Sequence, residues 1–114
     1  PERINKATAA IDWSKSHTWE FSPIDNEKYP AIELAKRCGQ VGAGLPAVYN
    51  AANEVAVAAF LAGQIKFTAI IDTVESVVQS FGSNTTTTIR DISDVSGIEQ
   101  SARSKAAEII KEIA

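Results

Sequence analysis

The sequence predicts an all-α fold, a bundle of about four helices that follows an irregular N-terminal linker. Two observations predict it. After residue 30, apolar residues recur at intervals of three and four, the spacing that places them on one face of a helix, and proline and glycine stand near the ends of these stretches. With 114 residues, 45% of them apolar, the chain is long enough for one domain with its own core.

Residues 1–29 show no sustained helical period, and we interpret them as a linker that leads into a helical domain at residues 30–114. The linker holds both tryptophans and the only histidine. Residues 18–21 (Thr-Trp-Glu-Phe) alternate between polar and apolar, and three of the four favour strands, so a short strand could form there. Such a strand would need a partner strand from elsewhere.

The first helix is expected to begin at Pro30, because proline fixes a helical φ and needs no amide partner in the first turn. It should end near residue 40, where Gly39, Gly42 and Gly44 follow closely. Its apolar stripe consists of Leu34, Ala35, Cys38 and Val41. Leu45 and Pro46 open a second helix of about 17 residues, which Gly63 terminates.

The second helix is apolar nearly all round, which predicts a place at the centre of the bundle with both faces covered. At 100° per residue, one face carries Val48, Ala52, Val55 and Ala59. The opposite face carries Asn50, Asn53, Glu54, Val57 and Leu61. The small alanines allow neighbouring helices to approach closely.

Two further helical segments complete the bundle. Thr68 can cap the third, whose continuous stripe consists of Ile70, Ile71, Val74, Val77, Val78 and Phe81. A polar connector at residues 82–88 follows it. Asp91 or Ser93 can cap a short helical turn that Gly97 interrupts, and Glu99 then lies four residues before Arg103. The last stripe consists of Ile98, Ala102, Ala106, Ile109 and Ile113.

Charge and hydropathy exclude two classes of partner. The chain has 14 acidic and 11 basic residues, so it has no excess positive charge for nucleic acid. No apolar run approaches the roughly 18 residues that span a bilayer, so no membrane partner is expected.

Reactive groups are few, and each has a structural explanation. The glycines of residues 39–44 follow a helix rather than the strand that a dinucleotide-binding loop requires, which favours a helix-to-helix turn. Cys38 lies on an apolar stripe while His17 lies in the linker, so we expect a buried, inert thiol. With one cysteine and one histidine, metal binding by this chain is not expected.

Five polar or aromatic residues are candidates for a structural or domain-interface role. Asn50, Asn53 and Glu54 cluster on one face of an otherwise apolar helix, where they would either bond loop backbone or cap a neighbouring helix, or contact a missing part of the polypeptide. Trp13 and Trp19 would either anchor the linker on another surface or pack on the bundle. No catalytic, cofactor-binding or metal-ligating residue is predicted.

The chain contains no methionine, and its first residue is Pro1. A translated chain begins with methionine, so we expect a domain excised from a longer polypeptide. Any function of the chain could then depend on residues that it lacks.

Residues 45–67 closely resemble the C-terminal part of the 1-deoxy-D-xylulose 5-phosphate reductoisomerase family. The family's Asn-Ala-Ala-Asn-Glu motif falls at residues 50–54, and its Ala-Phe-Leu and Ile-x-Phe elements follow at residues 59–61 and 65–67. Upstream, the segments Pro-Glu-Arg-Ile, Ile-Asp-Trp, Trp-Glu-Phe and Tyr-Pro-Ala are similar to the linker of that family. The resemblance spans nearly the whole chain.

The resemblance implies an NADPH-dependent enzyme that converts 1-deoxy-D-xylulose 5-phosphate to 2-C-methyl-D-erythritol 4-phosphate in non-mevalonate isoprenoid biosynthesis. It implies a homodimer, a divalent cation such as magnesium or manganese, and a location in the bacterial cytoplasm, or in the plastid for a plant protein. In the family the N-terminal and central domains hold the cofactor, the cation and the substrate, so this chain would be an inactive structural domain whose partners are those two domains.

Two other functions stay open on the sequence alone. The chain could be an independent helical protein-interaction module with no catalytic role, or an enzyme complete within these residues. We also expect the excised chain to self-associate, because its linker and one face of the bundle would lose the surface that covers them.

Overall fold

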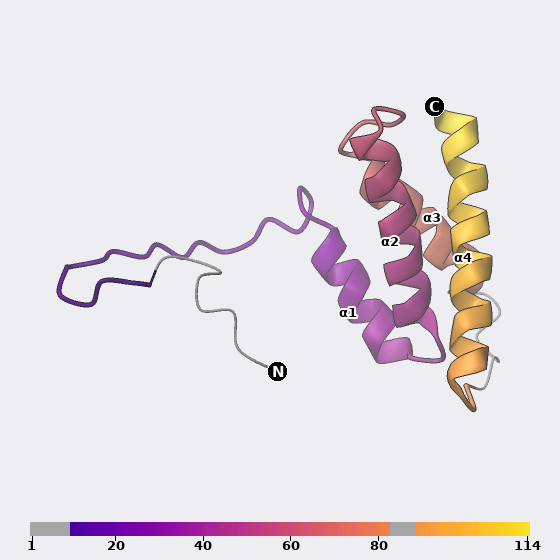
Figure 1. The fold of residues 1–114 in the computed structure, drawn as a ribbon, viewed down its shortest axis with the longest axis horizontal. Coiled ribbons are helices and arrows are strands. Elements are labelled where there is room, and N and C mark those ends of the chain that lie inside the picture. The colour runs from indigo at the N-terminus through magenta and orange to yellow at the C-terminus, as the bar shows by residue number, and fades with distance from the viewer. Residues whose placement is uncertain (1–9, 83–88) are drawn as a thin grey trace.

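Four helices follow one another in the computed structural model, which describes residues 10–82 and 89–114. They are α1 (Ala31–Val41), α2 (Leu45–Leu61), α3 (Ala69–Gly82) and α4 (Ile92–Ile113) (Figure 1). The described residues include no strand. The predicted all-α bundle of about four helices is therefore confirmed.

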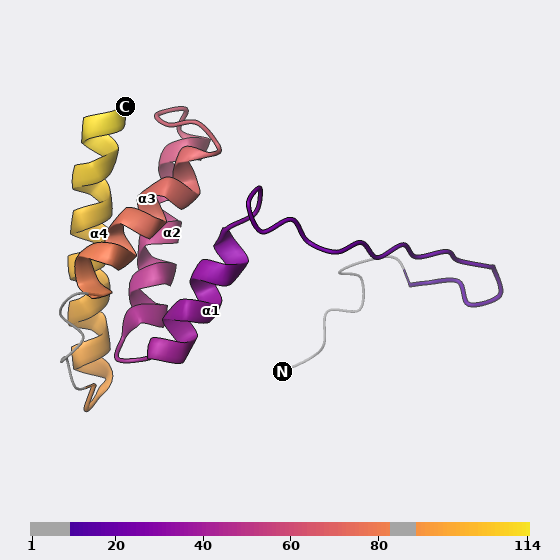
Figure 2. The ribbon, with the colours of Figure 1, turned by 180° about the vertical axis from the view of Figure 1, so that it is seen from behind.

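Helix α2 lies at the centre of the bundle, as predicted. It packs most extensively against α3 and α4, and α1 makes a smaller contact with α2 and a still smaller one with α3 (Figures 1 and 2). Small side chains line its buried surface: Ala51, Ala52 and Ala56 are all fully buried. Ala102 and Ala106 of α4 are fully buried as well, so small side chains on both helices allow α2 and α4 to pack closely.

The remaining core side chains come from every helix. They include Leu34 and Cys38 of α1, Val48 of α2, Val74 and Val77 of α3, and Ile110 of α4. The predicted stripe of α3 is confirmed, since its valines are buried and Ile71 and Phe81 pack against the same cluster. On α1 the prediction was wrong for Ala35 and Val41, which are exposed because α1 is covered on one side only.

The ends of the first two helices follow the proline and glycine pattern. Pro30 immediately precedes α1, and Gly42 ends it by donating its N–H to the Cys38 carbonyl at 3.0 Å. Residues 42–44 all have positive φ, and at Gly44 φ is 86°. This left-handed turn reverses the chain so that α2 can begin at Leu45, with Pro46 in its first turn.

Helix α4 differs from its prediction in two ways. It runs without a break through Gly97, and Ile110 is buried where the predicted stripe placed Ile113, which is exposed. A glycine inside a helix costs only about 1 kcal/mol. Two amides bonded to the Asp91 cap and the burial of Ala102 and Ala106 outweigh that cost.

The starts of α4 and α3 are stabilised in different ways. Asp91, rather than Ser93, caps α4, accepting hydrogen bonds from the amides of Ser93 and Asp94. At the start of α3, the amides of Ala69 and Ile70 bond to the carbonyls of Lys66 and Phe67, where a cap by Thr68 was predicted. The predicted polar connector lies outside the described residues from residue 83 onward.

Residues 10–29, called the N-terminal arm below, extend away from the helices (Figure 1). Two aspartates close turns within the arm. Asp12 accepts hydrogen bonds from the amide and hydroxyl of Ser14, and Asp25 accepts from the amides of Glu27 and Lys28. Between these turns the backbone of residues 16–24 makes no hydrogen bond within the described part of the chain.

Candidate functional site

The reactive side chains do not come together. Cys38 is buried in α1, and burial raises the pKa of its thiol, which keeps it protonated and unreactive. His17 lies in the N-terminal arm, where its Nε2 is 2.9 Å from the Asp12 carbonyl oxygen. Among the described residues, no three His, Cys, Asp or Glu side chains form a group that could hold a metal ion. The predicted buried thiol is confirmed.

The glycine-rich turn between α1 and α2 is a packing feature. A Cβ on Gly44 would lie 2.9 Å from Cδ1 of Ile98 and 3.3 Å from Cδ1 of Ile89. Apolar side chains therefore occupy the space above this turn, where a phosphate-binding loop would need room for an anion. The helix-to-helix turn predicted from the glycines is confirmed.

Two of the predicted interface residues, Asn50 and Glu54, join a polar cluster on the outside of α2. The Asn50 side-chain amide donates to Oε1 of Glu54 at 2.8 Å, and Nη2 of Arg103 on α4 lies 2.6 Å from Oε2 of Glu54. Glu54 therefore bridges two helices. This differs from the predicted bonds to loop backbone or helix caps, and the sequence did not identify Arg103 as a partner.

Asn53 is half-buried, and its side chain makes no hydrogen bond within the described residues. It shares its side of α2 with Val57, also half-buried, and with Leu61, which is 77% exposed. The prediction that both faces of α2 are covered was wrong for this side, because the other three helices leave it open. The assignment of Asn50, Asn53 and Glu54 to a domain interface stays a prediction.

Arg103 and Asn50 hold the pKa of the Glu54 carboxyl below its usual range, chiefly through hydrogen bonds to the ionised form. A lowered pKa in the folded state stabilises the fold above the unfolded-state pKa of about 4.3, and that contribution is lost as the pH falls through the lowered value.

We therefore expect Glu54→Gln to lower the free energy of unfolding slightly at pH 7, because the pair is solvent-exposed. The difference from the wild type should vanish in acid, where Glu54 is protonated. Urea unfolding at a series of pH values measures this difference in the free energy of unfolding. Glu99→Gln is the matched control, since Glu99 lies four residues before Arg103 but pairs with no described residue. An equal loss in both variants would contradict the assignment.

The two tryptophans lie in the N-terminal arm, away from the helices. Trp13 is 82% exposed and Trp19 is 67% exposed, so neither packs on the bundle. Phe21 is 85% exposed, with its ring centroid 6.5 Å from that of Trp19. Phe21 was not among the residues predicted at an interface, although its place two residues after Trp19 in an alternating segment was a usable signal.

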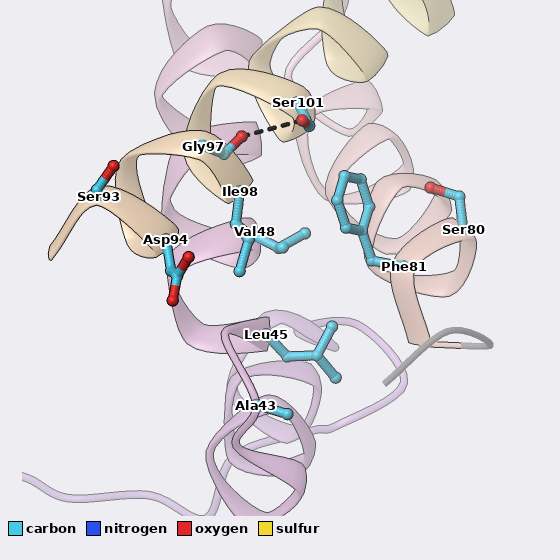
Figure 3. A pocket seen from close by; sticks show the side chains of 10 residues that line it. All are labelled: Ala43, Leu45, Val48, Ser80, Phe81, Ser93, Asp94, Gly97, Ile98 and Ser101. Atoms are coloured by element: carbon cyan, nitrogen blue, oxygen red, sulfur yellow. Dashed lines mark hydrogen bonds between the residues drawn. The ribbon is translucent and has the colours of Figure 1, made fainter. Parts of the chain in front are cut away.

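A pocket of 550 Å³ lies where the α1–α2 turn meets the end of α3 and the start of α4 (Figure 3). Its larger apolar side chains are Leu45, Val48, Phe81 and Ile98. Most of its polar side chains already have partners: Asp94 pairs with Arg90, and the hydroxyls of Ser80 and Ser101 donate to the carbonyls of Val77 and Gly97. No polar group in this pocket marks a ligand.

Comparison with known proteins gives one consistent result. The DXP reductoisomerase C-terminal domain family matches residues 1–105. The chain is 47% identical over 109 residues to the 1-deoxy-D-xylulose 5-phosphate reductoisomerase of Kitasatospora griseola. The matched residues cover 96% of this chain and 28% of that protein. The chain is 44% identical over 114 residues to the enzyme of the same name from Streptomyces coelicolor, covering 100% of this chain and 27% of that protein.

A solved structure is similar along the same span. It is the 1-deoxy-D-xylulose 5-phosphate reductoisomerase from Zymomonas mobilis in complex with NADPH, with a TM-score of 0.78 and 36% identity over 96% of this chain and 28% of that chain. The chain therefore spans less than a third of the length of these relatives.

No described helix is both long and apolar enough to cross a membrane.

Proposed function

The chain belongs to the DXP reductoisomerase C-terminal domain family, and on that basis we propose that it is the structural C-terminal domain of an NADPH-dependent enzyme. That enzyme converts 1-deoxy-D-xylulose 5-phosphate to 2-C-methyl-D-erythritol 4-phosphate in isoprenoid biosynthesis. The observation that carries the proposal is 47% identity along 96% of the chain to a reductoisomerase of which the chain covers 28%. This similarity favours the enzyme over an independent interaction module.

The described residues do not fit the groups that the reaction needs. Hydride transfer requires a nucleotide cleft, and a divalent magnesium or manganese ion requires clustered oxygen ligands. The described residues offer no group of three acidic, histidine or cysteine side chains, and apolar side chains pack against the Gly44 turn. We infer that the N-terminal and central domains of the same polypeptide hold NADPH and the cation.

This chain then has a structural role, in which it supports the catalytic part of the enzyme. The N-terminal arm packs against the catalytic part of the enzyme, and the open side of α2 with its Asn50–Glu54–Arg103 cluster faces another domain. Exposed aromatic rings on the arm and a polar cluster beside half-buried Val57 are typical of surfaces that become covered in a larger assembly. We place the enzyme, a homodimer, in the cytoplasm of a bacterium, or in the plastid if its source is a plant.

Activity measurements on two proteins test the proposal. The full-length polypeptide that contains this chain is expected to oxidise NADPH when mixed with 1-deoxy-D-xylulose 5-phosphate and magnesium, as followed by NADPH absorbance. This chain alone is expected to give only the background rate. Turnover by the chain alone would contradict a purely structural role, and an inactive full-length polypeptide would contradict the enzyme assignment.

We also expect this chain to self-associate in isolation. Its exposed apolar side chains include Trp13, Trp19 and Phe21 on the arm, and Leu61 and Phe67 at the α2–α3 end of the bundle. Sedimentation velocity should show the mean sedimentation coefficient rising with concentration, and Trp13→Ser combined with Trp19→Ser should reduce that rise. A monomer at millimolar concentration would contradict the prediction.

A further inference from the structure

The arm segment at residues 17–22 has the alternating sequence of a strand, and no other described segment pairs with its backbone. Its N–H and C=O groups make no hydrogen bond within the described part of the chain. The ring centroids of Trp19 and Phe21 lie 6.5 Å apart, close to the rise of about 6.6 Å that two residues make along a β-strand. The two rings therefore lie on the same side of an extended chain.

The side chains of this segment divide into two faces. Trp19 and Phe21, at 67% and 85% exposure, alternate with Thr18, Glu20 and Ser22. A strand with one apolar and one polar face is suited to a sheet that is covered on one side and open to solvent on the other. The turns closed by Asp12 and Asp25 lie before and after the segment and limit the pairing stretch to the residues between them.

The comparisons show that this segment corresponds to part of a much longer polypeptide. The chain spans 28% of the Zymomonas mobilis reductoisomerase, so most of that enzyme lies outside the matched part. The similarity extends over 96% of this chain, and the 4% left over is far shorter than the N-terminal arm. Much of the arm therefore has a counterpart in an enzyme where the other domains are present.

We propose that residues 17–22 add as an edge strand to a β-sheet in the part of the reductoisomerase polypeptide outside this chain, with Trp19 and Phe21 covering an apolar surface of that sheet. The proposal rests on the proposed function, because it requires the other domains. Main-chain hydrogen bonds would supply affinity, and the two rings would fix which face turns inward. Thr18, Glu20 and Ser22 would remain in solvent.

Residue-resolved hydrogen exchange on the full-length polypeptide tests the pairing. In an edge strand, the N–H groups of alternate residues point toward the partner strand and the others point to solvent. We therefore expect slow exchange at either His17, Trp19 and Phe21 or Thr18, Glu20 and Ser22, with the intervening amides about tenfold or more faster. Fast exchange throughout, or equal protection of neighbouring amides, would overturn the proposal.

Side-chain variants of the full-length polypeptide separate the two faces. Trp19→Ser and Phe21→Ser are expected to abolish the alternating protection, while Thr18→Ser and Glu20→Gln are expected to retain it. Retention in the ring variants, or loss in the polar-face variants, would overturn the assignment of faces.

NADPH oxidation, measured on the same full-length preparation, separates this proposal from the proposed function. An active polypeptide with an unprotected segment overturns the strand alone. An inactive polypeptide overturns the enzyme assignment, and alternating protection in it would still support the strand.

Discussion

Replacing Ala52 by leucine is expected to lower the free energy of unfolding of this chain by about 3 kcal/mol, and the melting temperature by roughly 10 °C or more. Ala52 is fully buried on α2, in the core cluster to which all four helices contribute. Three added carbon atoms have no space between closely packed helices, so the helices must separate or the side chain must leave its preferred rotamer. Thermal and urea unfolding followed by circular dichroism measure the change.

Ala58→Leu is the matched control. Ala58 lies on the same helix but is exposed, so the same change in volume should alter stability by no more than about 0.5 kcal/mol. Equal effects at the two positions would show that helix propensity, and not packing, determines the outcome. A neutral Ala52→Leu would mean that the core around α2 is looser than the structure indicates.

Gly44→Ala is expected to destabilise the chain by about 2 kcal/mol. Two costs combine at this position. A non-glycine residue at φ 86° is strained, and the new Cβ would lie 2.9 Å from Cδ1 of Ile98, so the end of that side chain must shift at a smaller additional cost.

Gly63→Ala separates these two costs. Gly63 also has a left-handed φ, of 72°, but a Cβ there would meet nothing within 4 Å. The control should therefore cost only the backbone strain, about 1 kcal/mol. If both variants lost the same stability in urea unfolding, the contact between the turn and Ile98 would contribute nothing, which would contradict the packing described for this turn.

The ends of α1 and α2 could be predicted almost to the residue, because local chemistry determines them. Pro30 and Gly63 restrict where a helix can begin and end, whatever packs around them. The uninterrupted course of α4 could not be predicted in the same way. A glycine such as Gly97 weakens a helix locally, and only tertiary contacts, here the burial of Ala102 and Ala106, decide whether the helix continues.

The candidate residues were predictable as a group but not in their contacts. Spacing alone placed Asn50 and Glu54 on one side of α2, and the structure joins them. Spacing also favoured a pair between Glu99 and Arg103 within α4, whereas Arg103 pairs with Glu54 across two helices. Which of two carboxylates an arginine reaches depends on how the helices are placed, and sequence spacing contains no such information.

Helix α1 is covered on one side only, so we expect it to separate from the bundle more easily than the other three helices. Helix α1 is held by two buried side chains, Leu34 and Cys38, by a hydrogen bond of 3.3 Å from the Tyr49 hydroxyl to the Ala31 carbonyl, and by a solvent-exposed ion pair between Arg37 and Glu75 of α3. The arm joins the bundle through this helix, so tension along the chain reaches α1 first. It should detach as a separate foldon while α2, α3 and α4 stay assembled. Cys38 is the only thiol of the chain, so its labelling rate would report that partial unfolding directly.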